Sequence, residues 1–108
     1  MDLLAADAVG DGQVVGEDHD GVELVVWRTF EGRACVQEAR CPHLFSHLAA
    51  EGVVDGDELV CAAHLWRFTR RGTGWLIGGD GRRSPVTDLR TYPCQEQDGR
   101  IVADLSEA

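Results

Sequence analysis

The chain has 108 residues, of which 44% are hydrophobic, and its formal net charge is −9. This length suits one domain with a single core, and the acidic excess disfavours nucleic acid and anionic membranes as partners. No run approaches the roughly 18 consecutive apolar residues of a membrane-spanning helix.

The N-terminal third predicts short antiparallel strands. Residues 1–12 are acidic, and we expect them to form a short turn that leads into the first strand. They lack the basic start and the apolar core of a secretion signal. Residues 14–15, 22–28 and 34–39 are rich in β-branched side chains and are separated by turn signals. No segment has helical periodicity beyond a single turn at 49–51. The pattern predicts an all-β fold, a small antiparallel sandwich or barrel.

Residues 41–64 carry two short elements that could bind metal. Cys41-Pro42-His43 is followed by 17 residues and then by Cys61-Ala62-Ala63-His64. Each element offers one thiolate and one imidazole, which suit zinc or iron. A hairpin over Asp55-Gly56 would bring the two elements side by side. Four such ligands could hold one tetrahedral zinc, or a two-iron cluster with both cysteines on one iron and both histidines on the other.

The C-terminal third is glycine-rich at 72–81, a segment whose conformation the sequence leaves open, and ends in a predicted hairpin of residues 91–95 and 100–104. Its charge differs from the rest, because residues 65–108 carry a net +1 and residues 1–64 a net −10. Two alternatives stay open for the arginines of this part of the chain, a basic edge beside the metal site and a solvated face. The arginines concerned are Arg67, Arg70, Arg71, Arg82 and Arg83. Cys35 and Cys94 are expected in strands as free thiols of a reducing, cytoplasmic compartment, with their pairing as a minor alternative.

The residues around the two elements resemble the Rieske [2Fe-2S] family. The matching positions are Cys41-Pro42-His43, Leu48, Gly52, Gly56, Cys61, His64, Phe68 and Gly72-Thr73-Gly74. The run Cys61 to Phe68 is similar to the C-x-A-H-L-W-x-F segment of the small Rieske ferredoxins that serve toluene-type diiron monooxygenases. The resemblance covers most of the chain, from about residue 20 to 105.

This resemblance implies the fold, the cofactor and the ligands. Residues 1–108 would be one Rieske domain, with a cluster-binding part at about 40–86 inserted in a β base. Cys41 and Cys61 would bind the inner iron, and His43 and His64 the outer iron, of a 2Fe-2S cluster. A docking rim would surround the histidines: Leu44, Phe45, Leu65, Trp66 and Arg67. His47 is expected to be an ordinary loop histidine, and Ser84-Pro85 part of a third loop over the cluster.

The chain departs from high-potential Rieske proteins at several positions. Ser46 and Ala63 stand where those proteins have a disulfide between the ligand loops, and Trp66 and Phe68 replace a serine and a tyrosine that donate to the cluster sulfurs. Fewer donors favour a potential toward the lower end of the roughly −150 to +300 mV Rieske range.

The function implied is that of a non-catalytic ferredoxin. It would carry one electron from a flavin or iron–sulfur NAD(P)H reductase to a terminal oxygenase, preferably a diiron hydrocarbon or aromatic monooxygenase. The alternatives are the ferredoxin of a Rieske non-haem ring-hydroxylating dioxygenase, the small subunit of a nitrite-type reductase and, from another class, a zinc-binding structural interaction module.

Overall fold

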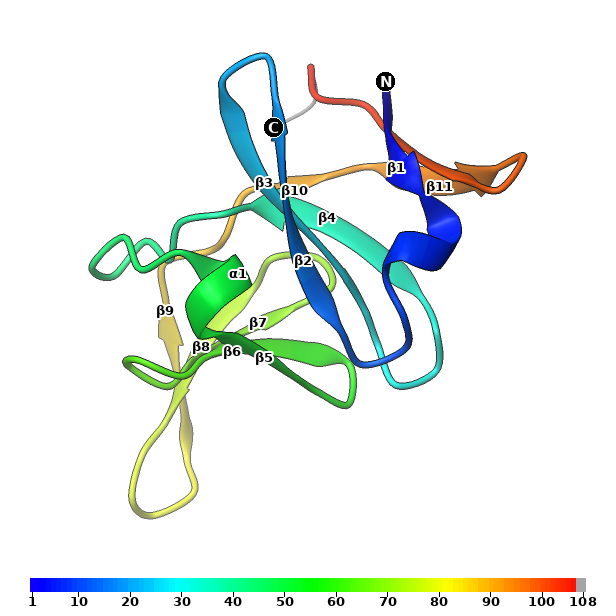
Figure 1. The fold of residues 1–108 in the computed structure, drawn as a ribbon. Helices are drawn as coiled ribbons and strands as arrows, with labels where there is room; N and C mark the ends of the chain where they lie inside the picture. Colours follow the sequence, from blue (N-terminus) through cyan, green and yellow to red (C-terminus); the bar gives the residue numbers. More distant parts are fainter. Residues whose placement is uncertain (107–108) are drawn as a thin grey trace.

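A computed structural model describes residues 1–106 as three antiparallel sheets (Figure 1). The first has the order β1-β12-β11, the second β10-β4-β3-β2 and the third β5-β6-β7-β8-β9. The bounds in the first two sheets are β1 Asp2–Ala5, β2 Val14–His19, β3 Val22–Arg28, β4 Ala34–Glu38, β10 Thr91–Tyr92, β11 Cys94–Gln97 and β12 Arg100–Ala103. Those in the third are β5 Gly52–Asp55, β6 Glu58–Cys61, β7 Trp66–Thr69, β8 Gly74–Ile77 and β9 Arg83–Val86.

Helical structure is confined to two short pieces of the described residues. A 3-10 turn, η1 (Ala6–Ala8), follows β1, and one helical turn, α1 (Leu48–Glu51), precedes β5. The expected all-β class and the single turn near residue 49 are therefore confirmed. No described helix has the length and apolar character needed to cross a bilayer.

The second sheet lies between two cores because β3 is apolar on both faces. Along β3 successive side chains point to opposite faces. Val25 and Trp27 pack toward the third sheet, and Leu24 and Val26 pack toward the first. All four side chains are fully buried. The continuous apolar run in the sequence is thus a central strand that is covered on both sides.

A buried amide joins the second sheet to the third. Gln37 of β4 is fully buried. Its Oε1 accepts from Trp27 Nε1 at 2.9 Å, and its Nε2 donates to the Thr69 carbonyl at 2.9 Å and to Thr91 Oγ1 at 3.0 Å. Every polar atom of this side chain has a partner, so its burial fixes the contact between the sheets without an unpaired group.

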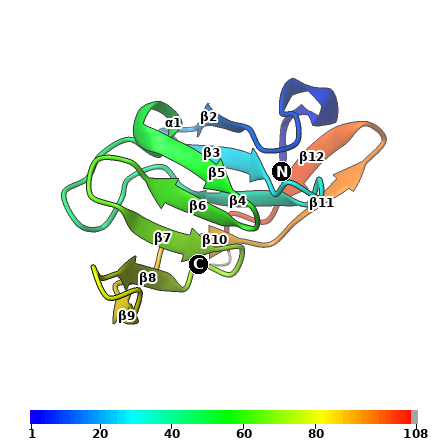
Figure 2. The same ribbon diagram turned by 90° about the horizontal axis from the view of Figure 1, so that it is seen from below.

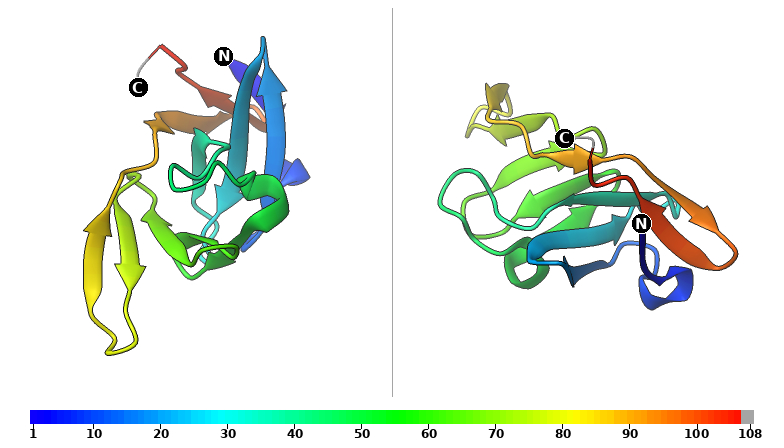
Figure 3. Two further views of the ribbon diagram at one scale, coloured as in Figure 1. Left: turned by 90° about the vertical axis from the view of Figure 1, so that its left-hand side faces the viewer. Right: turned by 90° about the horizontal axis from the view of Figure 1, so that it is seen from above.

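The third sheet carries the segment that the sequence left open. β8 and β9 form a hairpin that extends away from the rest of the molecule (Figures 1 and 3). Ser84 and Pro85 lie in β9, so the expectation that they form a separate loop over the metal site is wrong. Residues 1–12 were expected only to turn, but Asp2–Ala5 pairs with β12.

The loops after Cys41 and Cys61 lie at the same end of the molecule. Both project to the left in Figure 1 and again in Figure 2, which is turned by 90°. The first connects β4 to α1, and the second connects β6 to β7. The hairpin β5–β6 returns the chain between them, as the Asp55-Gly56 turn predicted.

Candidate metal centre

The two loops have the same local design. The Phe45 amide donates to the Cys41 carbonyl at 2.8 Å, and the Leu65 amide donates to the Cys61 carbonyl at 2.6 Å. Phe45 and Leu65 both have a positive φ, 61° and 63°. Each loop therefore turns back on its own cysteine within four residues and ends in the left-handed conformation, which is uncommon for bulky residues.

The four expected ligands come together as two pairs. Cys41 and Cys61 are fully buried, and the Cys61 thiol lies close enough to contribute to the raised pKa of Cys41. The rings of His43 and His64 meet edge to face, with centroids 4.6 Å apart. The sulfur pair thus lies inside, and His43 lies exposed at the surface. Within residues 1–106, no three His, Cys, Asp or Glu side chains converge on one point.

Two features of these side chains fit a bound metal cluster. The Nδ1 atom of His64 is buried and has no hydrogen-bond partner in the described chain, a costly state that a metal bond would relieve. Burial raises the pKa of the Cys41 thiol to about 11. A coordinated metal reverses this effect because it deprotonates the thiols bound to it. Two thiolates on one metal and two imidazoles on another suit a two-iron cluster.

The expected docking rim is only partly presented at the surface. Leu44, Phe45 and Leu65 are 62%, 69% and 63% exposed. Trp66 is half-buried, packs against the core, and places its ring 4.6 Å from the His43 ring at an interplanar angle of 32°. Trp66 therefore supports His43, and the three exposed apolar side chains flank the histidine pair.

Arg67 does not lie free beside the ligands. Its side chain is 18% exposed, and it donates to Asp55 Oδ2 at 2.5 Å and to Glu58 Oε1 at 2.9 Å. Arg83 donates to the same Glu58 carboxylate at 2.6 and 2.9 Å. These two arginines hold β6, β7 and β9 together, so Arg67 is an internal ion-pair partner and not part of an open rim.

Of the two alternatives for the arginines, a solvated face and a basic edge beside the metal site, the positions of Arg70, Arg71 and Arg82 do not support the second. Arg70 and Arg71 follow β7 at the end opposite His64, where they line a cavity with Cys35, Cys94 and Thr91. Arg82 lies in the exposed β8–β9 turn, 3.8 Å from Asp80. Arg70 and Arg71 are close to His64 in sequence, but strand β7 lies between them and separates them from the ligands in space.

The buried carboxylate yields a stability prediction. Glu58 is 6% exposed, and the hydrogen bond from Arg83, followed by that from Arg67, holds its pKa below the usual 4.5. Because the folded-state pKa is lowered, the stabilisation is complete above pH 4.5 and is lost as pH falls through the lower value. Glu58→Gln should lower the free energy of unfolding by about 3 kcal/mol at neutral pH, since it removes the buried carboxylate that pairs with Arg83 and leaves Arg67 with Asp55 alone.

Urea unfolding of both forms across pH measures this effect. The difference between wild type and Glu58→Gln should shrink in acid. The matched control is Asp55→Asn, which removes the 62%-exposed partner of the same Arg67 and should cost less than about 1 kcal/mol. Equal losses in the two variants would show that Glu58 is not the anchor.

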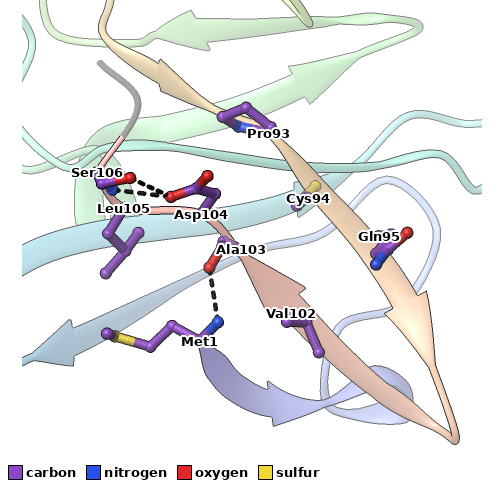
Figure 4. A pocket seen from close by; sticks show the side chains of 9 residues that line it. All are labelled: Met1, Pro93, Cys94, Gln95, Val102, Ala103, Asp104, Leu105 and Ser106. Atoms are coloured by element: carbon purple, nitrogen blue, oxygen red, sulfur yellow. Dashed lines mark hydrogen bonds between the residues drawn. The ribbon is translucent and has the colours of Figure 1, made fainter.

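One apolar cavity has no lining residue from the ligand loops. Figure 4 shows this cavity of about 420 Å³, which lies between the N-terminal residue and the C-terminal hairpin and includes Cys94 in its wall. Cys35 and Cys94 are free thiols in β4 and β11, as expected. Burial raises the pKa of Cys35 to about 12, so this thiol stays neutral and unreactive at physiological pH.

His47 is not among the paired ligands, in agreement with its expected role. Its Nδ1 accepts from the Ala49 amide at 3.1 Å and so caps α1. Two charged residues that the sequence analysis did not identify, Glu23 and Arg40, lie next to it. No short motif marks them, because Glu23 is distant in the chain and reaches the loop only through the sheet.

Comparison with known proteins gives a consistent family match. The family described as Rieske [2Fe-2S] domain matches residues 1–93. The chain is 37% identical over 90 residues to a cholesterol 7-desaturase of Bombyx mori. It is 33% identical over 81 residues to the oxygenase component of a 3-ketosteroid-9-alpha-monooxygenase of Rhodococcus rhodochrous. These matches cover 83% and 75% of this chain but 20% of each relative, so the chain spans about a fifth of their length.

Solved structures share the fold in two settings. A ferredoxin of Sphingomonas yanoikuyae B1 has a TM-score of 0.75 and 24% identity, and the match covers 96% of both chains. Dicamba monooxygenase with non-heme iron and dicamba has a TM-score of 0.83 and 22% identity, and the match covers 99% of this chain and 33% of that one. The same architecture therefore occurs as a separate ferredoxin and as part of a larger oxygenase.

Proposed function

The chain belongs to the Rieske [2Fe-2S] domain family, and we propose that Cys41 and Cys61 bind the inner iron of its cluster while His43 and His64 bind the outer iron. The proximity of the two cysteine thiols, and the contact between the two histidine rings, support this assignment. The cluster supplies one-electron redox chemistry when bound. Residues 40–86 would form the cluster-binding part of a single domain.

The protein side chains determine how an electron reaches a partner. The buried cysteines keep water from the inner side, and the exposed ring of His43 brings the redox centre to the surface. Trp66 packs beside that ring and limits its rotation. A Rieske domain alone is not catalytic, so the expected role is electron carriage to another protein.

Our first candidate acceptor is a terminal oxygenase with a diiron site, with electrons supplied by a cytoplasmic NAD(P)H reductase. The segment Ala63-His64-Leu65-Trp66, which resembles toluene-type ferredoxins, supports this choice. The second candidate is an oxygenase that acts on sterols or steroids. The names of the curated relatives support it, and in each relative the matched region is about a fifth of a larger protein.

Single-turnover reoxidation separates the two candidates. The reduced protein is mixed with a diiron hydroxylase and with a steroid oxygenase whose own Rieske centre has been removed, and the reoxidation rate is measured. Fast reoxidation only by the steroid oxygenase would exclude the diiron partner. Reoxidation by neither would exclude both candidate acceptors.

The apolar rim gives a further prediction for docking. Leu44→Ser and Leu65→Ser should each slow reoxidation by the true acceptor on the order of tenfold, because each removes an exposed apolar contact beside the histidines. The potential should not change. Phe30→Ser is the matched control, since Phe30 is 59% exposed but lies at the other end of β4 from Cys41. Equal slowing by all three variants would place docking elsewhere.

A further inference from the structure

Both stems of the first ligand loop meet the same carboxylate. Arg40 and His47, which flank residues 41–46, are joined by an antiparallel bridge. Glu23 of β3 accepts from Arg40 at both oxygens, with Oε1 3.2 Å from Nε and Oε2 2.9 Å from Nη2. The same Oε2 lies 3.5 Å from His47 Nε2. One side chain of the second sheet thus contacts the entry and the exit of the loop.

Arg40 extends this contact into the loop itself. Its Nη1 donates to the Phe45 carbonyl at 3.3 Å. Phe45 has a φ of 61° and is 69% exposed, so it has an unfavourable backbone conformation with little packing to maintain it. The hydrogen bonds of Phe45 to Arg40 and to the Cys41 carbonyl therefore hold this residue in its strained conformation, two residues after His43.

His47 is fixed from its other side. Its Nδ1 caps α1, and a Cβ added to Gly16 of β2 would lie 3.6 Å from His47 Cε1. Arg40 also holds the pKa of Glu23 below the usual 4.5, so the carboxylate stays ionised at neutral pH. The second ligand loop differs, because its entry is tied by a backbone bond from the Ala62 amide to the Glu51 carbonyl at 2.8 Å.

We propose that Glu23 is a positioning residue for the first ligand loop, which it holds through Arg40 and His47 so that His43 keeps its place at the surface. The importance of this role for the cluster rests on the proposed ligand set. The loop order that Glu23 imposes does not depend on that set. Removing the carboxylate should therefore loosen one ligand loop and leave the other and the overall fold intact.

Hydrogen exchange of the cluster-loaded protein, followed by mass spectrometry, tests the proposal. In Glu23→Gln, amides of residues 41–47 should exchange on the order of tenfold faster, while those of 62–65 should not change. The rate of iron release to a chelator should rise in parallel, and Glu23→Asp should recover part of both effects. The matched control is Asp2→Asn, which breaks a similar exposed pair with Arg100 at 3.0 Å in the first sheet and should change neither loop.

The exchange experiment can contradict the proposal in two ways. Unchanged exchange in 41–47, or equal acceleration in both loops, would overturn the proposal. If Glu23→Gln unfolds the protein, Arg40→Met replaces it and should accelerate exchange in residues 41–47 but not in 62–65, because it removes the contact between Glu23 and the entry of the first loop. Faster exchange without faster iron release would support the positioning of the loop and count against the ligand role of His43.

Discussion

Replacing His64 with cysteine is expected to lower the reduction potential of the protein on the order of 100 mV or more. The all-cysteine clusters of plant-type ferredoxins lie at about −400 mV, and Rieske clusters lie at roughly −150 to +300 mV, because neutral imidazole adds less negative charge than thiolate. His64 is favoured for this substitution because its buried Nδ1 has no partner in the described chain. Protein-film voltammetry of the loaded variant measures the change.

His19→Cys is the control for this experiment. His19 lies at the end of β2, 3.5 Å from Asp20, and takes no part in the ligand loops. Its replacement should leave the potential unchanged. If His64→Cys also leaves the potential unchanged while the cluster is retained, His64 is not a ligand.

Replacing Gly72 with alanine should give the largest loss of stability of any single methyl addition we consider, about 3 kcal/mol or more. Gly72 has a φ of +91°, and an added Cβ would lie 2.1 Å from the Leu89 carbonyl oxygen and 2.5 Å from Thr91 Oγ1. The Leu89 amide donates to the Gly72 carbonyl at 2.8 Å, and Leu89 packs in the core. The methyl group would thus push the 87–91 segment off the third sheet.

Two other glycines separate the causes of this loss. Gly81 has a φ of +80° but nothing within 4 Å of an added Cβ, so Gly81→Ala should cost only the conformational term, about 1–2 kcal/mol. Gly79 has neither restriction, and its alanine variant should be neutral. Urea denaturation ranks the three variants. If Gly72→Ala is no worse than Gly81→Ala, close packing at Gly72 is not the reason for the glycine.

The strands and the ligand loops could be predicted because their signals are local. Alternating or continuous apolar runs marked β3 and β4, and Asp55-Gly56 marked the hairpin that brings Cys61 to Cys41. The strand β1 was missed because its partner, β12, lies about a hundred residues away in the chain. The conformation of the glycine-rich segment could not be predicted, because Gly72 is needed for a close contact with the carbonyl oxygen of Leu89, which is distant in the chain.

The charged contacts could not be predicted from chain order. Arg67, Arg70 and Arg71 are neighbours in sequence, but β7 carries Arg67 to Glu58 and leaves the other two at its far end. Glu23 reaches Arg40 only because β3 and β4 pair in the observed register. Such contacts depend on the tertiary arrangement, so a basic cluster in a sequence is weak evidence for a basic surface.

Metal and sulfide analysis of the purified protein tests the central claim most directly. Two irons and two acid-labile sulfides per chain are predicted, with a red-brown colour and, after reduction, an electron paramagnetic resonance signal whose average g lies below the free-electron value. A colourless protein with one zinc and neither iron nor labile sulfide would contradict the assignment of Cys41, His43, Cys61 and His64 to a two-iron cluster.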